Sequence, residues 1–290
     1  SIYTTINSAN LILKHTPEIS FTNEATRNEV MANAYFLRAY CYFTLVRVFG
    51  DCPLLTSGFE SEKQEDMYPS RTAASEVYAQ VETDIEEALR LMPASSKLLH
   101  KASPAAINML RTEYYLWKAK RLGGGNAALS TAQSSVDAVL KAGYALLPTF
   151  ADIFNLNNEA NSELIWTLPY IVNENVTPGT SPNFFAYYLA PNGDRTRLRE
   201  AGYTEDEVPA GSHAQYVVPT QAYCDFLAED ARDTRTDVSV RVFEDKFLTE
   251  EVQIKRMVVK FKGSFANDTR SFDSDVPCLL YTSPSPRDCS

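Results

Sequence analysis

Residues 33–54 read NAYFLRAYCYFTLVRVFGDCPL and continue a helical pattern that begins near Glu24. Apolar side chains lie almost all around this helix, which is typical of a helix packed on most sides by other helices. The aromatic residues from Tyr35 to Phe49 are therefore expected in the core. Gly50 and Pro53 stop the pattern, because glycine commonly ends a helix and proline cannot continue one.

Further helices are predicted around this stretch from a period of 3.6 residues. Ser103 is a suitable N-cap, and Pro104 fits the first helical position because it has no amide hydrogen to leave unpaired. After a turn at residues 123–125, Asn126 is the expected cap of the next helix. Residues 84–93 resemble the closing half of a tetratricopeptide repeat. The predicted helices span residues 2–15, 24–49, 72–92, 104–121 and 126–141.

The helical periodicity of the sequence ends after Tyr144. A short strand is expected over residues 163–170, and Asn, Gly and Pro then interrupt the chain repeatedly to about Pro219. An interruption of this length is typical of a functional loop region. A helix over 220–228 and a strand over 252–261 follow. The fold class is mainly α: a tetratricopeptide-like helical scaffold over about residues 1–145, then a large irregular loop excursion with a few short strands over about 146–277.

Charge excludes one class of partner. The 290 residues carry a net charge of −10 and have a pI near 4.9. Nucleic-acid binding requires clustered Lys and Arg, so no nucleic-acid partner is expected. The sequence also contains no stretch of about twenty apolar residues that could span a membrane.

No pattern for catalysis, metal binding or cofactor binding is present. His15, His100 and His213 lie far apart, without an HExxH, CxxC or GxSxG motif, and each is interpreted as a surface or packing residue. The acidic pair Glu86–Glu87 does not suit glycoside hydrolysis, because adjacent residues on a helix point apart. We therefore expect no enzyme activity, no metal and no cofactor.

The last thirteen residues differ from the rest of the chain. Residues 278–290 resemble one reading frame of a transposase adapter used in DNA sequencing libraries, and they are interpreted as an artefactual tail. The alternative is a disordered terminus rich in Pro and Ser. Without the tail, Cys41, Cys52 and Cys224 remain, and an odd number without paired spacing predicts no disulfide framework. Cys41 and Cys224 are expected to pack as small buried apolar residues.

A family resemblance rests on the opening stretch. Residues 33–54 look like the LRAxxYFxLxxxFGDxPL signature of the SusD/RagB family. Ordered further matches follow over almost all of residues 1–277, which are therefore expected to form a single SusD-like domain truncated at both ends. These matches are at residues 69–71, 84–88, 110–115, 161–166 and 230–235.

The resemblance implies a function and a location. Members of this family are non-catalytic surface lipoproteins that capture nutrient glycans and deliver them to a SusC-like TonB-dependent transporter. They are seated in the outer membrane by an N-terminal lipid anchor, which is not present in this sequence. The expected ligand is thus an oligosaccharide or polysaccharide, and the expected location is the cell surface.

Glycan capture requires flat apolar faces for sugar rings, flanked by groups that hydrogen-bond hydroxyls. The densest such combination lies in the long excursion, where the family tends to place binding loops. Packing of Phe184, Phe185 and Tyr188 onto the scaffold is the alternative interpretation, and Tyr68, Tyr203 and Tyr216 are weaker candidates. The predicted glycan-binding residues are Asn183, Phe184, Tyr187, Tyr188, Asn192, Asp194 and Arg195.

Two other functions stay open. A helical repeat scaffold can bind a protein or peptide, and within the same family peptides are alternative ligands. A glycoside hydrolase is the less favoured possibility. Binding to polysaccharides without product release distinguishes capture from both.

Overall fold

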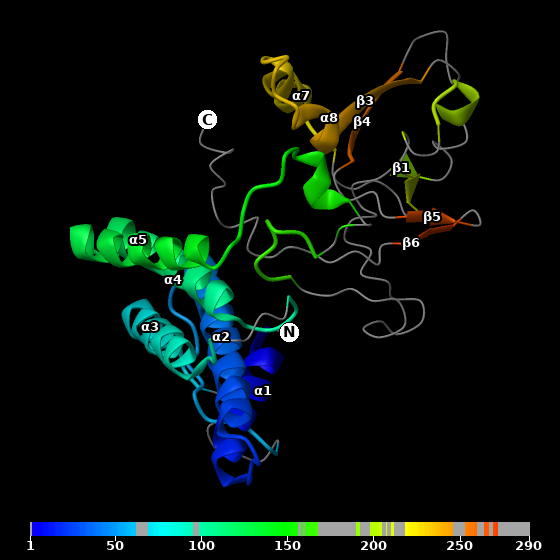
Figure 1. Ribbon diagram of the computed structural model, residues 1–290. Helices are drawn as coiled ribbons and strands as arrows, with labels where there is room; N and C mark the ends of the chain where they lie inside the picture. The colour runs from blue at the N-terminus through cyan, green and yellow to red at the C-terminus, as the bar shows by residue number, and fades with distance from the viewer. Residues whose placement is uncertain are drawn as a thin grey trace. The chain divides into compact units, whose positions relative to one another are not determined.

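The structure is a computed structural model in which contacts divide the chain into two compact units (Figure 1). The first holds residues 1–145 and 165–167, and the second holds residues 146–164 and 168–276. The structure describes residues 2–61, 69–94, 99–155, 158, 160–167, 190–191, 198–204, 207, 210–211, 218–245, 253–259, 264–266 and 269–271.

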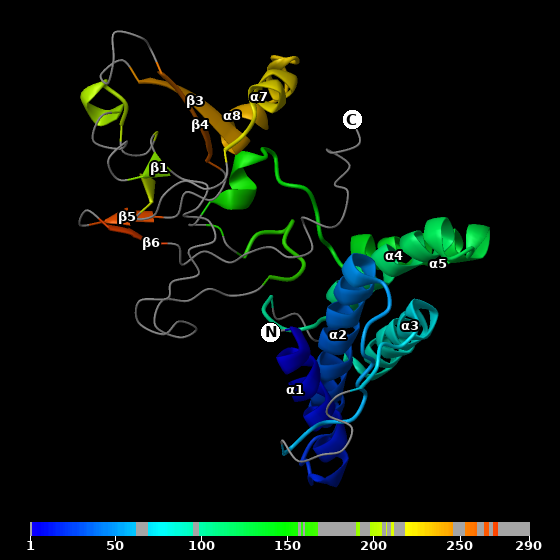
Figure 2. The same ribbon diagram turned by 180° about the vertical axis from the view of Figure 1, so that it is seen from behind.

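The first unit is helical, as the sequence predicts. Figures 1 and 2 show α2 between α1 and α3, and α5 lying along α4. Helices consecutive in the chain thus pack against one another, as expected of a tetratricopeptide-like arrangement, and a short turn joins α4 to α5. Its elements are α1 (Ile2–His15), the 3-10 helix η1 (Thr16–Glu18), α2 (Glu24–Phe49), α3 (Ala74–Leu91), α4 (Pro104–Arg121) and α5 (Gly125–Lys141).

Capping side chains fix where two of these helices begin. The Asn23 side chain accepts a hydrogen bond from the amide of Ala25, and the Ser103 hydroxyl accepts one from the amide of Ala106. Both satisfy amides that have no partner inside the helix. The prediction of a cap at Asn126 is wrong. The N-cap is Gly124, two residues before the predicted one, and α5 begins at Gly125 within the glycine turn.

The core of the first unit forms around α2. Phe36, Tyr42 and Phe43 are buried, and the Phe43 ring meets that of Tyr114 edge-on with centroids 5.8 Å apart. Each such side chain stabilises the fold by about 1.5–3 kcal/mol through its burial. Phe49 departs from the expectation that all aromatic residues of this helix are core, because it occupies the last helical position and is 62% exposed.

The segment 165–167 returns to the first unit. Trp166 is buried, and its ring meets Phe36 and Tyr40 edge-on at 5.2 and 5.5 Å. The amide of Thr167 donates to the carbonyl of Leu99. The predicted strand over 163–170 is wrong for its described part, because residues 163–167 form no strand and Trp166 packs against α2 through its side chain. Residues 168–170 lie outside the described ranges.

The second unit contains short elements. Strands β1 (Ala190–Pro191) and β2 (Ala210–Gly211) pair in parallel, whereas β3 (Val240–Asp245) with β4 (Gln253–Val258) and β5 (Ser264–Ala266) with β6 (Thr269–Ser271) pair antiparallel. The 3-10 helix η3 (Ala151–Phe154) and helices α7 (Gln221–Ala228) and α8 (Thr236–Ser239) complete it. The helix at 220–228 and the strand near 252–261 are thereby confirmed where described, while β3 was not predicted.

A small core supports the β3–β4 hairpin. Phe243 and Met257 lie on one face of the hairpin and pack with Leu198, and Val259 extends the cluster. The second unit therefore has an apolar centre of its own, much smaller than that of the first unit.

Candidate functional site

The predicted glycan-binding residues lie outside the part of the chain that the structure describes. Asn183, Phe184, Tyr187 and Tyr188 fall in residues 168–189, and Asn192, Asp194 and Arg195 fall in residues 192–197. Their role stays a prediction. Between these two stretches the structure describes β1, whose pairing with β2 fixes the backbone at residues 190–191.

The weaker candidates have different outcomes. Tyr68 and Tyr216 also lie outside the described ranges. Tyr203 packs edge-on against Phe243 with ring centroids 5.1 Å apart, and its hydroxyl oxygen accepts from the amide of Glu244 at 3.4 Å. The ring of Tyr203 therefore belongs to the small core of the second unit.

Two exposed aromatic residues on α7 were not singled out from the sequence. Tyr223 is 50% exposed and Phe226 is 64% exposed. Their spacing of three places them on neighbouring positions of the helix surface. That spacing, inside a helix already predicted from its pattern, was the available signal.

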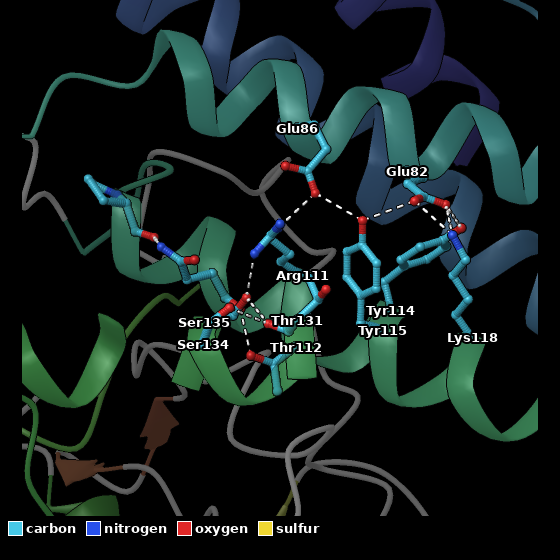
Figure 3. Close-up of polar contacts among 12 residues, drawn as sticks. Glu82, Glu86, Arg111, Thr112, Tyr114, Tyr115, Lys118, Thr131, Ser134 and Ser135 are labelled. Carbon is cyan, nitrogen blue, oxygen red and sulfur yellow. Dashed lines mark hydrogen bonds and ion pairs between the residues drawn. The ribbon is translucent and has the colours of Figure 1, made fainter. Parts of the chain in front are cut away.

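The most extensive polar cluster in the described residues lies between α3, α4 and α5 (Figure 3). Glu82 accepts from the hydroxyls of Tyr114 and Tyr115 at 2.8 and 2.9 Å and from the Lys118 ammonium at 2.7 and 2.8 Å. Glu86, one turn later on the same face, accepts from Tyr115 at 3.2 Å. Two carboxylates thus share one tyrosine hydroxyl.

Arg111 extends this cluster to α5. Its Nε donates to Glu86 at 2.7 Å, and its Nη1 donates to the Ser135 hydroxyl at 3.0 Å. The guanidinium carbon also lies 5.2 Å from the centre of the Tyr115 ring, and the Lys118 ammonium lies 5.4 Å from it. Both cations are therefore positioned by an aromatic face as well as by a carboxylate.

The electrostatics of this cluster favour a structural role over acid catalysis. Burial disfavours the charge on Glu82, but hydrogen bonds from Lys118, Tyr114 and Tyr115 outweigh it and lower the pKa of Glu82. Burial, followed by the hydrogen bond to Glu82, raises the pKa of both tyrosines far above the usual range. A general acid for glycoside hydrolysis requires a carboxyl group with a raised pKa, and Glu82 has the opposite shift.

A second polar cluster is fully buried inside the first unit. The Arg38 guanidinium donates to both carboxylate oxygens of Asp84 at 2.8 and 2.6 Å. It also donates to the side-chain oxygen of Asn10 at 2.7 Å, and Gln80 donates to Asp84 at 2.9 Å. Burial raises the pKa of Asp84, while the hydrogen bonds from Arg38 oppose that change. The cluster joins α1, α2 and α3, and Arg38 lies within the family-like signature at residues 33–54.

The described residues also bear on metal binding, disulfide bonding and membrane crossing. They contain no group of three or more His, Cys, Asp or Glu side chains that could hold a metal ion. Cys41, Cys52 and Cys224 are buried and not disulfide-bonded, so the packing role expected of Cys41 and Cys224 is confirmed. Within the same ranges, none of the helices has the length and apolar character needed to cross a bilayer.

Known proteins resemble the chain in both sequence and structure. Residues 1–115 match a SusD-like family described as "Starch-binding associating with outer membrane". A solved SusD superfamily protein from Bacteroides vulgatus superimposes with a TM-score of 0.80 at 27% identity, covering 98% of this chain and 63% of that one. Sequence and fold together support membership of the SusD/RagB family.

Similar proteins include another solved structure and curated SusD-like proteins. B. fragilis NanU has a TM-score of 0.79 at 26% identity, covering 95% of this chain and 56% of that one. SusD-like protein P2 of Formosa agariphila is 27% identical over 240 residues, which are 82% of this chain and 43% of that protein. SusD-like protein P38 of the same organism is 31% identical over 210 residues, 66% and 38% of the two lengths. The chain thus spans less than half the length of these curated relatives.

Proposed function

We propose that this chain is part of a cell-surface protein that binds oligosaccharides or polysaccharides without cleaving them. The observation that carries the proposal is the match of residues 1–115 to a family described as starch-binding and associated with the outer membrane. The helical first unit suits this role, because binding loops require a rigid scaffold that holds them in place.

The binding site in this proposal is the loop region of the second unit. Phe184, Tyr187 and Tyr188 supply flat apolar faces for sugar rings, and the nearby Asn192 and Arg195 supply hydrogen bonds to hydroxyls. Sugars are uncharged in their common forms, so an acidic surface does not repel them.

Delivery to a partner completes the proposal. The captured glycan passes to a SusC-like TonB-dependent transporter in the outer membrane, and a lipid anchor holds the binding protein beside it. The family description, which names the outer membrane, supports this placement.

The absence of cleavage is part of the same proposal. Among the described residues, Glu82 and Glu86 lie one turn apart on α3, and both are bound by cations. The lowered pKa of Glu82 keeps it ionised near neutral pH, where it cannot donate a proton to a leaving group.

Affinity electrophoresis of the full chain in gels containing single polysaccharides tests capture directly. We expect slower migration in at least one gel and no release of reducing sugar on prolonged incubation. Tyr187→Ala with Tyr188→Ala should remove the retardation, because the platform for the sugar ring is lost.

Tyr223→Ala on α7 is the matched control, since it also removes a tyrosine from the second unit, one that is half exposed. It should migrate as the unchanged chain does. Retardation that survives the double substitution would contradict the placement of the site. Failure to bind any glycan, together with specific capture of a peptide, would contradict the function itself.

A further inference from the structure

Residues 53–60 form a strap that lies along α1. The Tyr3 hydroxyl donates to the carbonyl of Pro53 at 3.0 Å. The Asn7 side chain binds both backbone groups of Phe59, donating to its carbonyl at 3.0 Å and accepting from its amide at 2.7 Å. The strap is thus held by its backbone, and the helix supplies the side chains.

Asn10 and Tyr42 hold the middle of the strap. Asn10 donates to the carbonyls of Leu55 and Ser57 at 2.9 and 3.3 Å. The Tyr42 hydroxyl donates to the carbonyl of Leu55 and accepts from its amide, at 2.9 and 2.6 Å. These contacts place the strap over the buried Arg38 cluster, because Asn10 also accepts from Arg38.

Close packing leaves little freedom at Gly58. A side-chain carbon at this position would lie 2.7 Å from Leu11 Cδ2 and 2.9 Å from the Leu11 backbone nitrogen. Backbone atoms cannot move aside as a flexible side chain can. Up to Phe59, therefore, the strap is fixed by contacts that do not titrate near neutral pH.

The far end of the strap is held differently, by charged side chains. Glu60 contacts Nε2 of His15, and the Lys14 ammonium lies 3.3 Å from the same carboxylate. On its other side, Nδ1 of His15 lies 3.4 Å from Glu18 of η1. These three are the charged groups that act on the imidazole among the described residues.

The number of N–H donors on the imidazole decides how many of these carboxylates it can bind. An ionised carboxylate only accepts hydrogen bonds, and a neutral imidazole has one N–H donor and one bare nitrogen. With a carboxylate at each ring nitrogen, the neutral ring can satisfy only one of them and presents a lone pair to the other. The protonated ring donates to both.

We propose that His15 is a pH-sensitive latch that strengthens the attachment of the end of the 53–60 strap to the end of α1 when it is protonated, and weakens that attachment to the Lys14–Glu60 ion pair and at most one histidine hydrogen bond when it is neutral. The inference goes beyond glycan binding and does not depend on it.

The direction of the pH dependence follows from the neighbours of His15. Hydrogen bonds to Glu60 and then to Glu18 raise the pKa of His15 above its usual value of 6.5, and the Lys14 charge opposes them. A raised pKa in the folded state means that the latch contributes fully below about pH 6.5 and is lost as pH rises through the raised pKa.

Nuclear magnetic resonance of the full chain tests the latch. The His15 ring signal should titrate above 6.5 and shift back toward it in Glu60→Gln and Glu18→Gln. Over about pH 5.5 to 8.5, the window in which histidine changes charge, the amide of Phe59 should lose hydrogen-exchange protection, after correction for intrinsic rates.

Two variants distinguish an effect of His15 from a general effect of pH on the stability of the fold. His15→Gln should abolish the pH dependence at Phe59, whereas His100→Gln, which changes the histidine beside Thr167, should retain it. A His15 pKa at or below 6.5 would overturn the proposal. So would Phe59 protection that changes equally with pH in the unchanged chain and in His15→Gln.

Discussion

Two arginine–aspartate pairs of nearly the same geometry occupy opposite settings in the two units. Arg38 donates through Nε and Nη2 to Asp84 at 2.8 and 2.6 Å, and Arg232 does the same to Asp230 at 2.9 and 2.8 Å. The Arg38 and Asp84 side chains are 6% and 0% exposed, whereas those of Arg232 and Asp230 are 90% and 51% exposed.

The comparison shows that the same ion pair plays a different structural role in each unit. In the first unit the pair lies inside a packed core and joins three helices, so its loss affects the whole unit. In the second unit the pair bridges residues two apart in a turn and is exposed to solvent. Identical chemistry therefore stabilises a scaffold in one place and shapes a local turn in the other.

The largest expected effect comes from breaking the buried pair. Arg38→Ala leaves the Asp84 carboxylate buried without its cation, which should lower the free energy of unfolding by about 3–5 kcal/mol. Arg232→Ala should leave it almost unchanged, because solvent screens the exposed pair. Urea denaturation followed by circular dichroism measures both, and equal losses would contradict the comparison.

An effect of similar size is expected at Trp166. Trp166→Ala removes a buried ring that meets Phe36 and Tyr40, and it should cost about 3–5 kcal/mol of unfolding free energy. Phe226→Ala, on the exposed face of α7, should cost no more than about 0.5 kcal/mol. The same denaturation curves report both values, and a large loss at Phe226 would show that α7 packs more tightly than its exposure indicates.

A smaller effect with a pH signature is expected at Glu82. Glu82→Gln removes the charge that binds Lys118 and should destabilise the first unit by about 1–3 kcal/mol at neutral pH. Because the folded-state pKa of Glu82 is lowered, its contribution is present above its usual value of 4.5 and is lost as pH falls through the folded pKa.

Thermal unfolding between about pH 3 and pH 5 distinguishes this loss from a general one, because carboxyl groups titrate there while histidine stays protonated. Glu82→Gln should show a flatter pH dependence of stability than the unchanged chain. Glu76→Gln, an exposed change on the same helix, should keep the original dependence. Parallel curves for Glu82→Gln and the unchanged chain would argue against the lowered pKa.

The smallest effects concern the helix caps of the two units. Ser103→Ala should destabilise the first unit by about 1 kcal/mol, because the amide of Ala106 loses its partner. Thr220→Ala removes the cap of α7, because the Thr220 hydroxyl accepts a hydrogen bond from the amide of Tyr223. We expect faster hydrogen exchange of backbone amides in α7 alone. Faster exchange in the helices of the first unit as well would contradict a local role for this cap.

The first unit was largely predictable from its sequence because its signals are local. The bounds of α2 and the cap at Ser103 follow from periodicity and punctuation within a few residues. Trp166 was misassigned because an apolar run of this kind resembles a strand until its packing partners are known. The strap contacts of Asn7 also escaped prediction, since they join residues 52 positions apart.

The second unit was less predictable for a physical reason. Strand β3 is stabilised by pairing with β4 and by the burial of Phe243 against Leu198. A short-range sequence pattern does not predict such contacts. The glycan-binding loop was inferred from residue types and family resemblance, and it lies outside the described residues. Its placement therefore rests on chemistry alone.

Isothermal titration calorimetry tests most directly whether the second unit's loop holds the glycan. A polysaccharide that retards the full chain in gels would be titrated into the unchanged chain, Tyr187→Ala with Tyr188→Ala, and Tyr223→Ala with Phe226→Ala. Removing the loop aromatics should weaken binding at least about tenfold, as expected for the loss of about 1.4 kcal/mol, and removing the α7 aromatics should leave it unchanged. Equal affinity for the loop variant and the unchanged chain would contradict the account.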